Sequence, residues 1–170
     1  MYLYHGTLSI HLPGILGNGI DISKGKISVD FGQGFYLTND FAQAEKWAKL
    51  LAETYSKKMG EKVIPVVLKY EVNEPKLNQL LNVKEFKTAD EEWAKFVVDS
   101  RLLKSPKEYD LVIGPLADNK VHTLRKRIEC GLISYEDAIE EVRQKVHGNQ
   151  YAFRTSKSIG LLKRGKVVPL

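Results

Sequence analysis

The sequence predicts an α+β domain, in which helices and strands are mixed along the chain without strict alternation of strand and helix. Two observations support this fold class. Residues 63–72 are rich in Val and Ile, which is typical of a strand, and residues 41–59 carry apolar side chains at helical spacing. The chain has 170 residues, 43% of them hydrophobic, so it can form a single domain, residues 1–170, with its own core.

The N-terminal half begins with a short strand and leads to a long helix. In chain order, the expected elements are a strand at 2–5, a helix at 9–16, a loop at 21–30, a strand at 35–38 and a helix at 41–59. Gly17 and Gly19 end the first helix. Asn39 or Asp40 caps the second helix, and Gly60 ends it.

In the C-terminal half, strands and helices alternate less regularly. The expected strands are 63–72, 80–86, 110–115, 150–154 and 167–168. The expected helices are 89–103, 119–129 and 134–146, with a helical turn at 156–161. Ser134 and Asp137 have the spacing of a capping box, which supports the start of the third of these helices.

Composition and charge limit the class of protein. The net charge of +5 and the pI of about 9.1 permit an anionic partner such as a nucleic acid or a dinucleotide. Cys130 is the single cysteine, so no internal disulfide forms, and the four histidines are too scattered to predict a metal site. Neither a signal peptide nor an apolar run of about 20 residues is visible, so we expect a cytoplasmic protein without a membrane partner.

The first motif is His5-Gly6-Thr7. Without a Cβ, the N–H and C=O of Gly6 can approach a flat ligand closely and pair with both halves of a carboxamide. A surface histidine with its hydrogen bonds already satisfied is the other interpretation of this motif.

The second motif, residues 31–38, reads Phe-Gly-Gln-Gly-Phe-Tyr-Leu-Thr. Gly32 and Gly34 permit a tight turn, after which a strand presents Tyr36 on one face. Trp47 follows one helix length later and could stand opposite Tyr36 across a slot one ring wide. On helical periodicity alone, Trp47 belongs to the core. The Gly-x-Gly does not open a helix after a strand, which argues against a Rossmann site.

The third motif, Asn149-Gln150-Tyr151, begins the strand expected at 150–154. In this order, the motifs resemble the His-Tyr-Glu class of ADP-ribosyltransferases, which includes diphtheria toxin and the poly(ADP-ribose) polymerases. The polymerases carry Phe-Gly-x-Gly-Ile-Tyr-Phe, a second aromatic residue eleven positions after that tyrosine, and a late Asn-Glu-Tyr. Trp47 stands at the same offset from Tyr36. The chain also resembles a group of uncharacterised bacterial proteins near these enzymes, which share its segments 30–32 and 110–118 together with Trp93, Phe96 and Arg101.

The resemblance implies an ADP-ribosyltransferase-like split β-sheet core with flanking helices, and NAD as the substrate. It implies that His5 hydrogen-bonds the adenosine ribose, that Gly6 holds the nicotinamide carboxamide, and that Tyr36 and Trp47 sandwich the nicotinamide ring. Gln150 takes the place of the family's catalytic glutamate, so the expected catalytic residues are His5, Tyr36 and Gln150. The remaining residues expected near NAD are Thr7, Gly34 and Thr38.

Glutamine at position 150 departs from the family pattern. A carboxylate stabilises the charge that develops on the ribose, whereas glutamine can hold the ribose hydroxyl but cannot act as a base at neutral pH. Three interpretations stay open: slow transfer of single ADP-ribose units, a substitute acid such as Asp118 or Asp110, and binding of NAD without turnover. Asp118 precedes a predicted helix and could equally be its cap. Arg101 is expected to be the buried partner of such an aspartate.

These motifs predict an NAD-dependent mono-ADP-ribosyltransferase, a bacterial toxin or effector that modifies a protein or nucleic acid and releases nicotinamide. Its expected partners are NAD, the acceptor, and an antitoxin or immunity protein. The alternatives are an RNA 2′-phosphotransferase that uses NAD, and a non-catalytic module that binds NAD or ADP-ribose.

Overall fold

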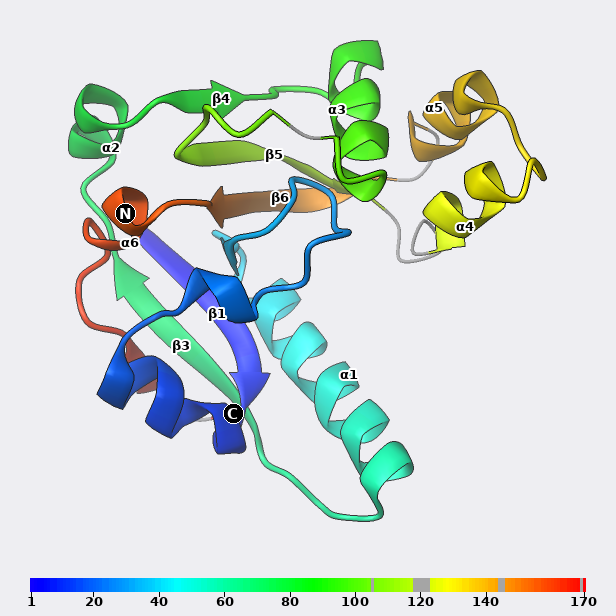
Figure 1. Cartoon of the computed structure of the whole chain (residues 1–170). Helices are drawn as coiled ribbons and strands as arrows, with labels where there is room; N and C mark the ends of the chain where they lie inside the picture. Colours follow the sequence, from blue (N-terminus) through cyan, green and yellow to red (C-terminus); the bar gives the residue numbers. More distant parts are fainter. Residues whose placement is uncertain (105, 118–122, 144–145, 169) are drawn as a thin grey trace.

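The computed structural model describes residues 1–104, 106–117, 123–143, 146–168 and 170. Its strands form two sheets, with helices packed against them (Figure 1). This mixture of helices and strands agrees with the predicted α+β class. No helix in the described part of the chain is both long and apolar enough to cross a bilayer.

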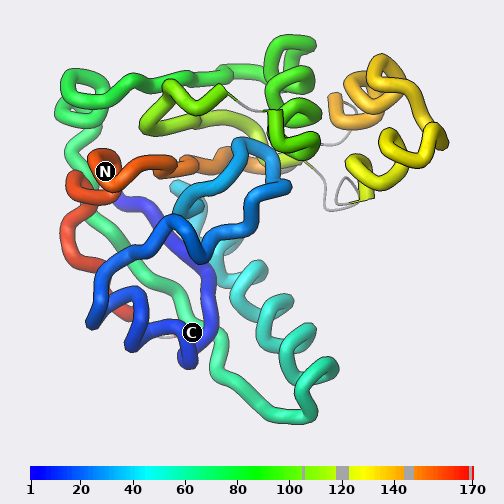
Figure 2. Tube along the Cα trace, viewed as in Figure 1, coloured from blue at the N-terminus to red at the C-terminus, as the bar shows by residue number. Residues whose placement is uncertain are grey.

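The first sheet has the strand order β1-β3-β7 and contains β1 (Tyr2–Leu8), β3 (Pro65–Glu71) and β7 (Lys166–Val168). Both pairings with β3 are antiparallel. The first and last strands of the chain therefore flank β3, and the blue and red ends of the trace belong to one sheet (Figure 2).

The second sheet has the order β2-β6-β5-β4 and contains β2 (Phe35–Leu37), β6 (Val146–Phe153), β5 (Leu111–Ala117) and β4 (Val83–Glu85). β4 and β5 are parallel, and the other pairs are antiparallel. A bridge joins the two sheets, because Tyr4 and Thr38 exchange backbone hydrogen bonds of 2.7 and 2.9 Å. This bridge places β1 beside β2 and so brings the first two motifs together.

The helical elements are η1 (Ser9–His11), η2 (Pro13–Asn18), η3 (Ile22–Lys24), α1 (Phe41–Met59), α2 (Glu74–Leu80), α3 (Glu91–Arg101), α4 (Leu124–Glu129), α5 (Tyr135–Arg143) and α6 (Ser156–Ile159). The single helix expected at 9–16 is wrong, because a 3₁₀ turn and a π-helical segment take its place. α2 was not predicted; the side chain of Asn73 caps it, and Pro75 occupies its first turn.

Helix α1 has the predicted ends and, apart from Trp47, the predicted buried face. The Asp40 carboxylate accepts hydrogen bonds from the first turn, and Gly60, at φ 73°, ends the helix. Its buried residues are Ala44, Ala48 and Ala52. Trp47 is 43% exposed, so its assignment to the core is wrong. The row of alanines lets the helix backbone approach β1.

Each face of the two sheets is covered by its own cluster of buried side chains. Phe35 and Phe153 belong to a cluster that includes Leu3 and Leu68 and therefore lies between the sheets. On the opposite face of the second sheet, Tyr36 packs against a cluster that contains residues of α3, α4 and α5. On the corresponding face of the first sheet, Ala44 and Ala48 of α1 pack with Val67 and Tyr4.

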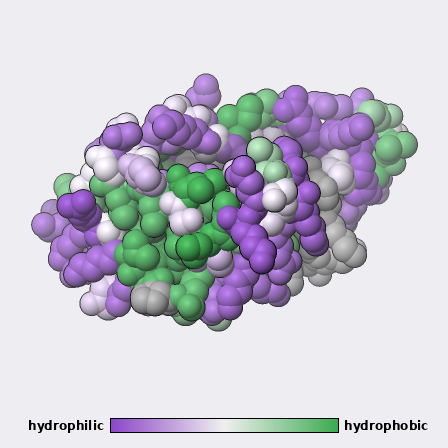
Figure 3. Space-filling view, turned by 90° about the horizontal axis from the view of Figure 1, so that it is seen from below, coloured by the Kyte–Doolittle hydropathy of each residue, from purple (hydrophilic) through white to green (hydrophobic). Residues whose placement is uncertain are grey.

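Hydrophobic residues also gather on the face seen from below in Figure 3. Ile10, Ile64 and Leu170 are among the large hydrophobic side chains that the structure leaves exposed. A 2.9 Å bond from Ser9 N to Ile64 O places the segments of Ile10 and Ile64 side by side. The protein therefore exposes apolar side chains outside its core.

Candidate functional site

One face of the joined sheets carries most of the predicted site. Alternate residues of a strand point to the same face, and residues paired across antiparallel strands share a face. Because Tyr4 pairs with Thr38, the face of β1 that packs on α1 continues into the face of β2 that packs on α3. The predicted site residues on this face are Gly6, Tyr36, Thr38 and Gln150.

Gly6 is the point where β1 touches α1. A Cβ at Gly6 would lie 2.1 Å from the carbonyl oxygen of Ala44, so only glycine fits there. Backbone bonds from Val72 N to Met1 O and from Ser9 N to Ile64 O show that odd-numbered residues of β1 bond toward β3. The N–H and C=O of Gly6 therefore point to the other edge, like those of Tyr4. In the described chain, no strand pairs with Gly6 along that edge.

Trp47 lies in the turn of α1 that Gly6 contacts. The same Cβ on Gly6 would also lie 3.1 Å from Ala48 N, one residue after Trp47. A large aromatic ring, 43% exposed, thus stands on the helix that packs against Gly6. Among the described residues no ring contact joins Tyr36 and Trp47, so the slot between them stays a prediction.

His5 faces the other side of β1, toward the cluster between the sheets. Its ring lies 4.3 Å from the ring of Phe35, centroid to centroid, and its Nδ1 is 2.8 Å from the carbonyl oxygen of Tyr36. A carbonyl only accepts, so Nδ1 carries the proton and Nε2 remains an acceptor in the neutral ring. Burial lowers the pKa of His5 to about 4, so this ring is neutral at pH 7.

The two threonines predicted near NAD already have partners inside the protein. Thr7 Oγ1 is 3.1 Å from Nδ1 of His11, and Thr38 Oγ1 accepts a 3.1 Å hydrogen bond from Asp40 N at the start of α1. Both threonines are buried. They stabilise the segments that carry Gly6 and Trp47.

The hydroxyl of Tyr36 closes the glycine turn on itself. It donates to the carbonyl oxygen of Gly32 at 2.6 Å and accepts from Phe31 N at 3.1 Å. Burial, with a further contribution from the charge of Asp30, raises the pKa of Tyr36 well above its usual value. Gly34 permits the close approach of β2 and β6, since a Cβ there would lie 2.9 Å from the carbonyl oxygen of Phe153.

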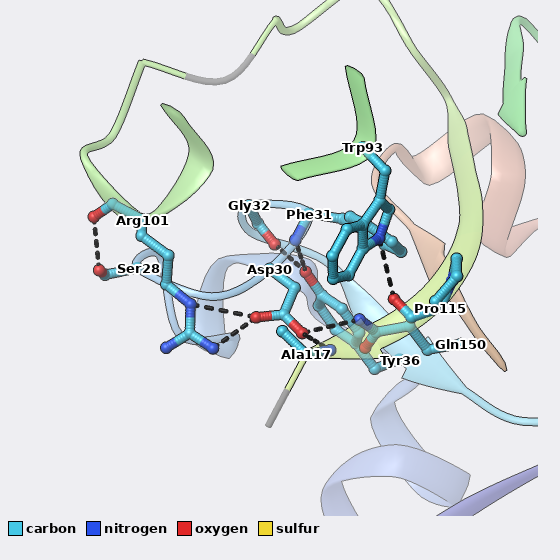
Figure 4. A network of polar contacts seen from close by, with 10 residues as sticks. All are labelled: Ser28, Asp30, Phe31, Gly32, Tyr36, Trp93, Arg101, Pro115, Ala117 and Gln150. Atoms are coloured by element: carbon cyan, nitrogen blue, oxygen red, sulfur yellow. Dashed lines mark hydrogen bonds and ion pairs between the residues drawn. The ribbon is translucent and has the colours of Figure 1, made fainter. Parts of the chain in front are cut away.

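A buried carboxylate, Asp30, organises the residues around Gln150 (Figure 4). Asp30 is 3% exposed. Its Oδ1 accepts two bonds from the Arg101 guanidinium, one of them 3.1 Å from Nε, and forms an ion pair with it. Its Oδ2 accepts from Ala117 N at 3.1 Å and from Gln150 Nε2 at 3.0 Å. The amide nitrogen of Gln150 is therefore committed to Asp30, which leaves Oε1 as the end that can accept from a ligand.

The chain was compared with known protein families, curated proteins and solved structures. The model of DUF3990, a family of proteins of unknown function, matches residues 1–164. The chain belongs to this family. No curated protein and no solved structure matches it.

The DUF3990 match includes α1 and every strand except β7, and so includes every predicted site residue. Sequence reasoning missed Asp30 as the centre of the network. The available signal was a charged residue directly before the aromatic Phe31 and the glycine turn. Arg101 has the buried aspartate partner that was predicted, but the partner is Asp30.

Asp110, one of the two other proposed acids, does not join the site in this DUF3990 chain. Asp110 accepts from Asn82 N at 3.0 Å and from the Thr155 hydroxyl at 2.7 Å, and it pairs with Lys157 at 3.6 Å. These bonds tie β5 to α6, so Asp110 has a structural role. Asp118 lies outside the described residues.

Proposed function

We propose that the protein is an NAD-dependent mono-ADP-ribosyltransferase. The observation that carries the proposal is the strand edge of Gly6 with which no described strand pairs, together with the exposed Trp47 on the helix that packs against Gly6, and with Tyr36 and Gln150 on the same face. One N–H and one C=O on a single residue match the two halves of a nicotinamide carboxamide. An exposed tryptophan offers the ring a stacking surface.

The proposed reaction breaks the bond between nicotinamide and C1′ of its ribose. Nicotinamide leaves with the bonding electron pair, and a nucleophile of the acceptor attacks C1′ and loses a proton. Oε1 of Gln150 would hold the ribose hydroxyl, and the neutral Nε2 of His5 can accept from a second hydroxyl of NAD. Without a carboxylate at position 150 the reaction should be slow, since removing one preorganised electrostatic group typically costs about 10²–10³ in rate.

The acceptor and the cellular partners follow from the same proposal. The acceptor is a protein or a nucleic acid, and the net charge of +5 suits an anionic one. As a cytoplasmic toxin or effector, the protein would need an antitoxin or immunity protein in the cell that makes it.

The test combines NAD binding with tryptophan fluorescence. Trp93 is fully buried, whereas Trp47 is 43% exposed, so NAD should quench mainly the red-shifted emission of Trp47. Trp47→Leu should remove both the quenching and the release of nicotinamide. Leu50→Ala is the matched control, because Leu50 is equally exposed on the same helix at 43%. A wild-type protein that shows no NAD binding by calorimetry contradicts the proposal.

A non-catalytic NAD-binding module is the second candidate, favoured by one observation. The nitrogen of the Gln150 amide is bound to Asp30, and Asp30 itself is neutralised by Arg101. If this candidate is right, NAD raises the melting temperature of the wild type while nicotinamide release stays at background.

A further inference from the structure

A groove lies between the loop of residues 22–33, the C-terminal end of α3 and the end of β6. In Figure 1 this loop is the blue segment that passes in front of β6. Gly32 lines the groove, so the groove adjoins the glycine turn that Tyr36 closes. Arg154 lines it from the end of β6, four residues beyond Gln150, or about 13 Å along an extended strand.

Two of the side chains that line the groove are cationic. Lys107 and Arg154 line it, and none of the described lining residues is acidic. Burial lowers the pKa of Arg154, but a guanidinium stays charged at neutral pH. An anion in the groove would therefore meet two cations and no lining carboxylate.

A buried hydroxyl without a partner lies in the wall of the groove. Ser100 lines the groove, is 1% exposed, and its Oγ has no hydrogen-bond partner in the described structure. A serine inside a helix usually bonds to a carbonyl of the preceding turn or to water. A hydroxyl left unbonded in a buried place is costly, so it is a donor that a ligand could satisfy after a rotation of its side chain.

Two exposed apolar side chains line the same groove. Leu103 has a left-handed backbone, φ 63°, at the end of α3, where glycine is the usual residue. Its side chain is 46% exposed, so burial in the core does not explain the leucine. Ile27, across the groove, is 52% exposed.

We propose that this groove binds a phosphate ester attached to an aromatic or apolar group, which is the chemistry of a nucleotide. Lys107 and Arg154 pair with the phosphate, and the Ser100 hydroxyl donates to it. Ile27 and Leu103 contact the flat apolar part. This site is separate from the Gly6 edge and does not depend on cleavage of NAD.

Three probes separate the parts of the proposed ligand: AMP, adenosine and inorganic phosphate. Backbone amide signals of the full chain in NMR report where each one binds. AMP should shift the signals of residues 27, 32, 33, 100–104 and 107 and bind at least about tenfold more tightly than adenosine or phosphate, since it makes both kinds of contact. Equal affinity for AMP and adenosine, or no shift in these signals, overturns the proposal.

Variants test the individual contacts. Lys107→Ala should weaken AMP binding about tenfold, whereas Lys58→Ala, at the far end of α1, should leave it unchanged. Ser100→Ala should act in two opposite directions, raising the melting temperature of the free protein and weakening AMP binding several-fold. A Ser100→Ala protein that binds AMP as the wild type does contradicts the role of the hydroxyl.

The two proposals fail separately. Trp47→Leu should abolish NAD binding at the Gly6 edge and leave the AMP shifts in the groove intact. If Trp47→Leu removes those AMP shifts instead, AMP occupies the proposed NAD site and the groove is not a separate site.

Discussion

Gln150 donates its amide hydrogen to Asp30, a carboxylate that also accepts bonds from Arg101 and from Ala117 N. A glutamate at position 150 would set a second carboxylate about 3 Å from the first, and two such groups cannot both be ionised. The amide therefore suits its neighbour, whatever the site does with NAD. The sequence reveals the glutamine but not this reason, because Asp30 is 120 residues away along the chain.

Gln150→Glu should lower the free energy of unfolding by about 2–3 kcal/mol, because a buried bond becomes a repulsion. Adding Asp30→Asn moves the carboxylate from position 30 to position 150 and restores a donor between them. The double variant should therefore lose less unfolding free energy than the two single variants lose together, by about 1–3 kcal/mol. Urea unfolding measures this cycle, with the exposed Gln79→Glu as the control. Additive effects would contradict the contact.

His5 makes stability depend on pH in a defined direction. Its pKa falls from 6.5 in the unfolded chain to about 4 in the folded protein. Between these values the unfolded chain binds the extra proton, so stability is highest above pH 6.5 and falls as the pH drops toward 4, by up to about 3 kcal/mol. His5→Asn should flatten this part of the curve in urea unfolding measured from pH 7 to pH 4. An unchanged slope would mean that His5 titrates normally.

At the scale of elements, the contact of β1 with α1 depends on the absence of a side chain at Gly6. The helix and both of its ends were predictable from Asp40, Gly60 and the spacing of apolar residues. Ala44 and Ala48 of its buried row were also predictable, but the exposure of Trp47 was not, because Trp47 lies on the same helical stripe. Alanines occupy the buried row because their small side chains let the helix backbone approach the glycine.

Gly6→Ala should destabilise the protein by about 1–3 kcal/mol, because its Cβ has to push α1 away from the sheet. Gly14→Ala is the matched control: a Cβ at Gly14 meets nothing within 4 Å, so this change should be neutral or slightly stabilising. Thermal unfolding of the two variants checks the difference. Equal melting temperatures would show that the contact is looser than described.

At the scale of the whole molecule, the α+β class and most elements followed from local patterns, whereas the pairing of strands did not. The hydrogen bonds that place β6 between β2 and β5, and the bridge from Tyr4 to Thr38, join segments far apart in sequence. The site depends on these pairings, since Gly6, Tyr36 and Gln150 come from three different strands. The prediction of one helix at 9–16 was wrong for a local reason, because Pro13 and Gly14 interrupt that helix.

Because the proposed NAD site draws on both sheets and α1, it exists only in the folded chain, and NAD should stabilise the fold as a whole. A ligand at 100 times its dissociation constant adds about 2.7 kcal/mol to the free energy of unfolding. Urea unfolding with and without NAD should therefore show a higher midpoint with an unchanged slope. Trp47→Leu should unfold at the same midpoint in both conditions, while Leu50→Ala keeps the shift. A shift that survives Trp47→Leu would place NAD somewhere other than the edge of Gly6.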